Sequence, residues 1–180
     1  TAARVMMAIA ASFALLLTAG WFMFSQPATP DQLFADNFKV HQDVLSIEIE
    51  DRLAETGFGN NKVQLELLNQ GITAYNAKNY STAISIFENF EQAAPEDPLT
   101  DYAKFYKSIA LIETDQLTAA AENLEVLSRK ASSPIMDDIV WNLALINLKQ
   151  NEIRSAIFSL RKLTTSEKYK EKAEKILKDL

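Results

Sequence analysis

Residues 64–95 read QLELLNQGITAYNAKNYSTAISIFENFEQAAP, and this stretch decides the fold because it predicts a pair of antiparallel helices. In its second half, Tyr80, Ala83 and Phe87 recur at spacings of three and four residues, which is the apolar stripe of an amphipathic helix. Gly71 places a small residue in the middle of the first half. Pro95 ends the pair, because proline cannot continue a helix. The stretch has no residue pattern that is typical of catalysis.

The same pattern returns twice, first 37 residues further along the chain and then after another 36. The pattern consists of Gly71, Tyr80, Ala83, Phe87 and Phe90. The equivalent positions are Ser108, Leu117, Ala120, Leu124 and Leu127 in the second copy, and Ala144, Ile153, Ala156, Leu160 and Leu163 in the third. This pattern resembles the tetratricopeptide (TPR) repeat, which has a small residue in its first helix, a large apolar residue at the turn, and alanine three residues later. The usual TPR spacing is about 34 residues, so the resemblance implies slightly longer loops between repeats.

The resemblance covers roughly residues 64–163 and implies an all-α fold. We expect residues 62–180 to form a TPR-like α-solenoid of about three helix-turn-helix repeats. The expected helices cover residues 64–77, 81–93, 99–113, 117–128 and 153–163, and a further helix begins at Pro134. A last helix over residues 166–180 would cap the solenoid, because the end of a repeat array needs a polar outer face to remain soluble.

An uncharged run of twenty residues extends from Val5 to Phe24. As a helix it spans about 30 Å, which matches the hydrocarbon core of a bilayer, so we expect residues 1–25 to form one transmembrane helix before the solenoid. Arg4 precedes this run and Trp21 lies near its other end, an arrangement that favours a cytoplasmic N-terminus. The alternative is a signal peptide cleaved near Gly20, although the apolar run continues past that site. Because the chain begins with threonine, we also expect further cytoplasmic residues before it.

Residues 26–61 are expected to link the membrane helix to the repeats. Two prolines among small polar residues mark a short spacer, after which Asp31 is positioned to cap a short helix over residues 31–38. Residues 40–50 alternate in part, with Ile47 and Ile49 between acidic neighbours, which favours an extended segment over a helix. The stretch TGFGNN at 56–61 is a strong loop signal before the first repeat.

Composition argues against several classes of chemistry. The chain has no cysteine, which excludes disulfides, thiolate metal sites and a cysteine nucleophile. Its formal net charge is −6, so we expect no nucleic-acid partner; residues 31–127 carry 17 acidic and 6 basic side chains, and residues 128–180 carry 7 and 11. The single histidine, His41, has acidic neighbours at spacings that match no metal motif, and no nucleophile pattern surrounds it. We therefore expect no enzyme activity, cofactor, metal or small-molecule substrate.

In TPR proteins the first helix of each repeat builds the concave face, and carrying those positions over gives an apolar set. These candidate partner-groove residues are Leu68, Ile72, Tyr75, Tyr102, Phe105, Ile109, Ile112, Trp141, Leu145 and Leu148. Two interpretations are open: a groove for a protein partner, or core that another part of the chain covers. The segment from Leu33 to Ile49 is apolar and precedes the repeats by a short loop, so we expect it to lie against this face or the first repeat as a built-in ligand.

These features together predict a membrane-anchored scaffold for protein–protein interaction. It would lie in the inner membrane through the helix from Val5 to Phe24, with its TPR domain in the periplasm or otherwise outside the cytoplasm. The layout resembles bacterial single-span TPR proteins, either the YfgM-like ancillary subunits of the Sec translocon or the TPR-bearing relatives of anti-sigma membrane proteins. An alternative function is that of a small structural accessory subunit in a larger membrane protein complex.

Overall fold

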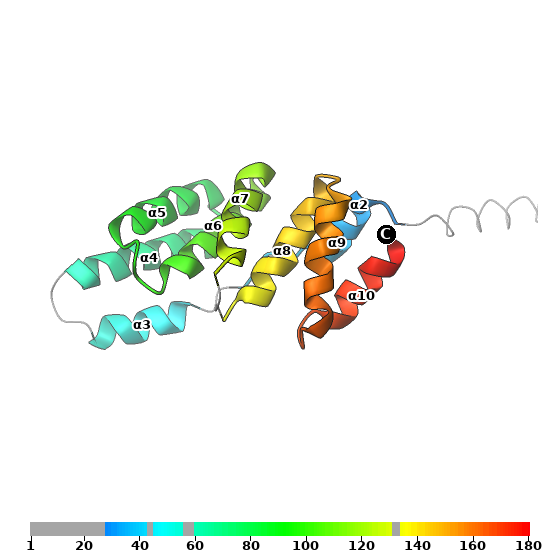
Figure 1. Ribbon diagram of the computed structural model, residues 1–180. Helices are drawn as coiled ribbons and strands as arrows, with labels where there is room; N and C mark the ends of the chain where they lie inside the picture. The colour runs from blue at the N-terminus through cyan, green and yellow to red at the C-terminus, as the bar shows by residue number, and fades with distance from the viewer. Residues whose placement is uncertain (1–27, 43–44, 56–59, 131–133) are drawn as a thin grey trace, which may run out of the picture.

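The computed structural model describes residues 28–42, 45–55, 60–130 and 134–180, and every regular element within these ranges is a helix (Figure 1). The all-α class predicted from the sequence is therefore confirmed. The helices are α2 (Pro30–Asn37), α3 (Ser46–Glu55), α4 (Asn60–Asn76), α5 (Tyr80–Ala93), α6 (Thr100–Glu113), α7 (Leu117–Ser128), α8 (Met136–Lys149), α9 (Ile153–Lys162) and α10 (Lys170–Asp179), with a 3-10 turn at Leu163–Thr165 before α10.

Helices α4 to α9 pack in chain order, each against the helix before it. Three-residue connections join α4 to α5, α6 to α7 and α8 to α9, so each of these pairs is an antiparallel hairpin. Figure 1 shows the hairpins next to one another, from green through yellow to orange, with α10 in red at the end of the row. Helix α10 packs against α9 and buries Ala173 and Ile176.

The three hairpins turn in the same way. Lys78, Asp115 and Asn151 each have a φ close to +60°, in the left-handed region, directly after the first helix of a hairpin. The N–H of the next residue reaches back to the helix, as Asn79 does to the carbonyl of Ala74 at 2.9 Å, and equivalent bonds of 2.8 and 2.7 Å follow Asp115 and Asn151. This is the Schellman pattern of helix termination. The left-handed residues are separated by 37 and 36 positions, which is the spacing found in the sequence pattern.

Small residues allow close contact between the two helices of each hairpin. Ala83, Ala120 and Ala156 on the second helices are completely buried. In the first hairpin, a Cβ atom added to Gly71 would lie 2.7 Å from a ring carbon of Phe87, well inside normal contact distance. Glycine is therefore required at this position by the packing of α4 against α5, not by the local backbone.

Residues 46–50 do not form the extended structure that we expected over residues 40–50. Residues from Ser46 onward are helical as part of α3, and Leu45 and Ile49 are buried in the same apolar cluster as Leu65 and Leu68 of α4. The reason is that Leu45, Ile49 and Leu53 recur every four residues, which puts them on one face of a helix. The two-residue spacing of Ile47 and Ile49, which favours an extended segment, does not determine the structure here.

Helix α2 is present where a short helix was expected, but Asp31 does not cap it. Thr29 is the N-cap, its side chain accepts a hydrogen bond from the Gln32 N–H, and the Gln32 side chain accepts one from the Thr29 N–H. This is a capping box, with Pro30 in the first turn and Asp31 following it. Helix α2 packs against α8, so the described part of the expected linker lies on the hairpins and not apart from them.

The expected membrane helix from Val5 to Phe24 lies outside the described residues. Among the residues that are described, no helix is both long and apolar enough to cross a membrane.

Candidate functional site

The candidate partner-groove residues lie on α4, α6 and α8, the first helix of each hairpin, as the sequence predicted. Nine of the ten are buried, and Tyr102 is half-buried. The buried residues are Leu68, Ile72, Tyr75, Phe105, Ile109, Ile112, Trp141, Leu145 and Leu148. Of the two interpretations left open, the structure corresponds to the second, because these residues are core that another part of the chain covers.

The cover is formed by residues 28–42 and 45–55, here called the covering segment. Helix α2 of this segment packs on α8, and α3 packs on α4. Between them, the hydroxyl of Tyr75 on α4 donates a hydrogen bond to the carbonyl of His41 at 2.7 Å, and that of Tyr106 on α6 donates one to the carbonyl of Gln42 at 3.3 Å. The covering segment thus contacts all three hairpins. The prediction that residues from Leu33 to Ile49 lie against this face is confirmed for those that the structure describes.

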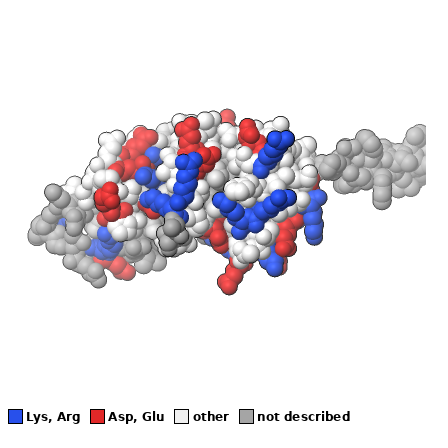
Figure 2. Space-filling model, in the orientation of Figure 1, with Lys and Arg blue, Asp and Glu red and all other residues white. Residues whose placement is uncertain are grey.

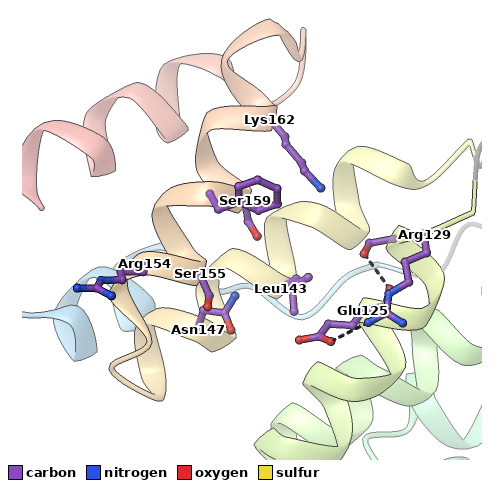
Figure 3. Close-up of a pocket in the computed structure, with 10 residues that line it drawn as sticks. Glu125, Arg129, Leu143, Asn147, Arg154, Ser155, Ser159 and Lys162 are labelled. Carbon is purple, nitrogen blue, oxygen red and sulfur yellow. Dashed lines mark hydrogen bonds and ion pairs between the residues drawn. The ribbon is translucent and has the colours of Figure 1, made fainter.

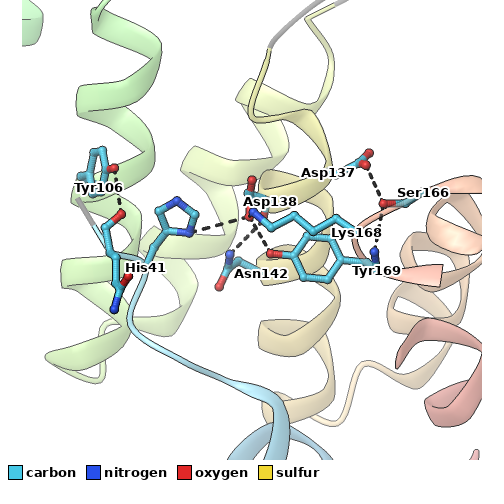
Figure 4. A network of polar contacts seen from close by, with 9 residues as sticks. His41, Tyr106, Asp137, Asp138, Asn142, Ser166, Lys168 and Tyr169 are labelled. Atoms are coloured by element: carbon cyan, nitrogen blue, oxygen red, sulfur yellow. Dashed lines mark hydrogen bonds and ion pairs between the residues drawn. The ribbon is translucent and has the colours of Figure 1, made fainter. Parts of the chain in front are cut away.

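A polar network anchors the middle of the covering segment (Figure 4). Its centre is the buried carboxylate of Asp138 on α8, which accepts hydrogen bonds from the Tyr169 hydroxyl at 2.5 Å and from the Lys168 ammonium at 2.7 Å. The Nδ1 atom of His41 lies 3.7 Å from the same carboxylate. Asp138 therefore joins α8, the covering segment and the turn that precedes α10.

The surroundings of the network shift two pKa values. Burial lowers the pKa of His41, the nearby Asp138 carboxylate partly opposes this shift, and the positive charge of Lys168 adds to it. Burial also raises the pKa of the Tyr169 hydroxyl, and the hydrogen bond to Asp138 raises it further. Both residues are thus favoured in their neutral forms, which suits a structural contact. No group of three His, Cys, Asp or Glu side chains that could hold a metal ion occurs among the described residues.

A hollow of about 340 Å³ lies beside this network, and Trp141, Lys168, Tyr169 and Lys172, which line part of it, are engaged with one another or with Asp138. Trp141 stacks on Tyr169 with ring centroids 4.7 Å apart and an angle of 11° between the ring planes. Lys168 is bonded to Asp138, and Lys172 lies 5.8 Å from the centroid of each of the two rings. These contacts leave the hollow a poor candidate for ligand binding.

A larger groove, of about 450 Å³, opens between α7 and α9 (Figure 3). Leu143 and Asn147 of α8 line its base, and both are nearly buried. One side comes from the end of α7 with Glu125 and Arg129, and the other comes from α9. This α7–α9 groove is formed by the second helices of two hairpins, so it is separate from the face that the covering segment occupies.

Phe158 on α9 is the most unusual residue of the α7–α9 groove, because 64 % of it is exposed. Its ring is contacted by the ammonium of Lys162, 4.6 Å from the ring centroid. Phe158 is not among the candidate residues predicted from the sequence. The available signal was its register: Ala156 and Leu160 mark the buried face of α9, and Phe158 falls between them, on the face where polar residues are expected.

No protein-family model, curated protein or solved structure matches this chain significantly. A functional proposal must therefore come from the chain's own residues and from the surfaces that they form.

Proposed function

We propose that this protein is a membrane-anchored scaffold for protein–protein interaction, in which α4 to α9 form three TPR-like repeats of an α-solenoid. The repeated residue pattern and the three equivalent left-handed turns support the repeat assignment. The apolar run from Val5 to Phe24 supports an anchor in the inner membrane, with the helical domain outside the cytoplasm.

The α7–α9 groove is the observation that carries the proposal. The face formed by α4, α6 and α8 is filled by the covering segment, so a partner cannot dock there without displacing buried residues such as Leu45 and Ile49. The α7–α9 groove is open, lies in the size range of ligand sites, and presents a large exposed aromatic residue. Aromatic and arginine side chains are enriched where proteins contact one another. We therefore place the partner site in this groove.

Site-specific photo-crosslinking in intact cells tests the proposal. A photoreactive phenylalanine analogue at position 158 is compared with the same analogue at Val63 on α4, which is also 64 % exposed but lies on a different hairpin. We expect a discrete crosslinked product from position 158 and none from position 63. Equal products at both positions, or no product at position 158, would overturn the assignment of the groove.

The membrane orientation is tested separately, and the absence of cysteine makes the experiment simple. Ser81→Cys, at an exposed position at the start of α5, should react with a membrane-impermeant maleimide added to intact spheroplasts. Ala2→Cys should react only after the membrane is opened. The reverse pattern would contradict the proposed orientation.

A further inference from the structure

We propose that the α7–α9 groove binds an acidic peptide segment that carries a large apolar side chain. This inference rests on the proposed scaffold function and names the chemistry of the partner. The evidence begins with the charge of the groove, which is opposite in sign to that of the whole chain.

The charge of the groove is the first argument. Arg129, Arg154 and Lys162 line it, against one carboxylate from Glu125, so the groove carries a local excess of two positive charges on a chain of net charge −6. The Arg129 guanidinium lies 3.5 Å from Glu125, and both side chains are well exposed, so water screens the pair. No ion pair involving Arg154 or Lys162 occurs within the described part of the chain. Figure 2 shows Lys and Arg side chains on the face over α9.

The apolar surface of the groove is the second argument. The exposed ring of Phe158 forms one side and Leu143 lies at the base, so a leucine or phenylalanine from a partner can be buried between them. The surrounding basic side chains then face whatever charges flank that apolar residue. Complementary charge favours carboxylates on both sides of it.

A peptide fits these features better than a nucleic acid does. Affinity for a phosphate backbone comes mainly from clustered Lys and Arg side chains, whereas this groove also contains the carboxylate of Glu125 and the chain as a whole is acidic. A peptide can place its apolar residue at the base of the groove and direct its carboxylates away from Glu125.

Fluorescence anisotropy with defined peptides tests the inference on the whole chain in a nonionic detergent. The probe is a labelled ten-residue peptide of Glu and Asp with Leu-Phe at its centre. Two comparison peptides replace Leu-Phe by Ser-Ser, or replace the acidic residues by Lys and Arg. We expect the acidic apolar peptide to bind, the serine peptide to bind about tenfold more weakly, and the basic peptide not to bind measurably.

Variants of the protein locate the binding. Arg154→Glu combined with Lys162→Glu should abolish binding, while Arg161→Glu, an exposed charge reversal on the same helix but outside the groove lining, should leave it within about twofold. Phe158→Ser should weaken binding about tenfold, and Val63→Ser should not change it. Equal thermal melting of all variants shows that folding is intact, as expected for exposed positions.

Besides a failure of the acidic peptide to bind, three results would overturn the inference. The first is equal binding of the acidic and basic peptides, and the second is equal loss of binding in Arg161→Glu and the double variant. The third is that a single-stranded DNA oligonucleotide binds more tightly than the peptide and that the double variant loses this binding. That result would assign the groove to nucleic acid. If the peptide fails to bind while position 158 still crosslinks to a protein, the partner chemistry is wrong and the scaffold function stands. If both experiments fail, both proposals fail.

Discussion

Replacing Gly71 with alanine measures how closely α4 and α5 approach in the first hairpin. The new Cβ atom would lie 2.7 and 2.9 Å from two ring carbons of Phe87 and 3.2 Å from Cγ2 of Ile86, whereas carbon atoms in good contact are about 3.5–4.0 Å apart. Phe87 is completely buried, so its ring can move away only against the side chains packed around it. The hairpin must therefore open slightly to accept a single methyl group.

Two effects of opposite sign determine the size of the change. Alanine inside a helix is favoured over glycine by about 1 kcal/mol, and overpacking a core costs about 1–3 kcal/mol. Because two atoms of one rigid, buried ring are involved, we expect the upper part of that cost. The free energy of unfolding should fall by about 1–2 kcal/mol in Gly71→Ala.

Urea unfolding followed by circular dichroism measures this change. Thr73→Ala is the control, since Thr73 is exposed on the same helix and alanine there gains helix propensity without a clash; its stability should be unchanged or slightly higher. A Phe87→Leu background should relieve the clash, so that Gly71→Ala costs about 1 kcal/mol less there than in the wild type. If Gly71→Ala stabilises the protein as Thr73→Ala does, the close approach of α4 and α5 at this point is wrong.

Three further predictions concern other parts of the molecule. Ala120→Leu, at a completely buried position of α7, should lower the free energy of unfolding by about 1–3 kcal/mol. Ala119→Leu, at the exposed neighbouring position, should not lower it. Equal effects of the two variants in urea titrations would refute the packing of α6 against α7. Because burial lowers the pKa of His41, the unfolded chain takes up a proton more readily than the folded one, so stability should be complete above the usual pKa of about 6.5 and should fall as the pH drops below it. NMR titration of this single histidine and urea unfolding at pH 5.5 and 7.5 check the shift, and an ordinary pKa would contradict it. Deleting residues 31–51 should uncover the apolar face of α4, α6 and α8 and increase the fluorescence of a hydrophobic dye, with dimerisation or aggregation; a monomer with unchanged dye binding would show that the covering segment does not protect this face.

The sequence alone determined the class of the fold and the positions of the hairpins. Tyr80, Ala83 and Phe87 recur with helical spacing, and their equivalents follow 37 and 36 residues apart, so the signal for each hairpin is local and repeated. The burial of Ala83, Ala120 and Ala156 follows from the same register. A covering segment was one of two interpretations of the apolar positions on α4, α6 and α8, and the apolar residues from Leu33 to Ile49 made that segment the expected cover.

The tertiary structure decided which surfaces are closed and which are open. One example is the stretch after Leu45, whose sequence allows a helix or an extended segment. Contact with α4 favours the helix, because a helix places Leu45 and Ile49, four residues apart, on the one face that is buried. The role of Asp138 also required the fold, because its partners His41 and Tyr169 are distant in the sequence. The register of α9 places Phe158 opposite the buried Ala156 and Leu160, but only the packing of α7 and α9 on α8 brings Phe158 into one groove with Glu125 and Arg129. Local periodicity gives the face of each helix, but only the packing of distant segments determines what covers that face.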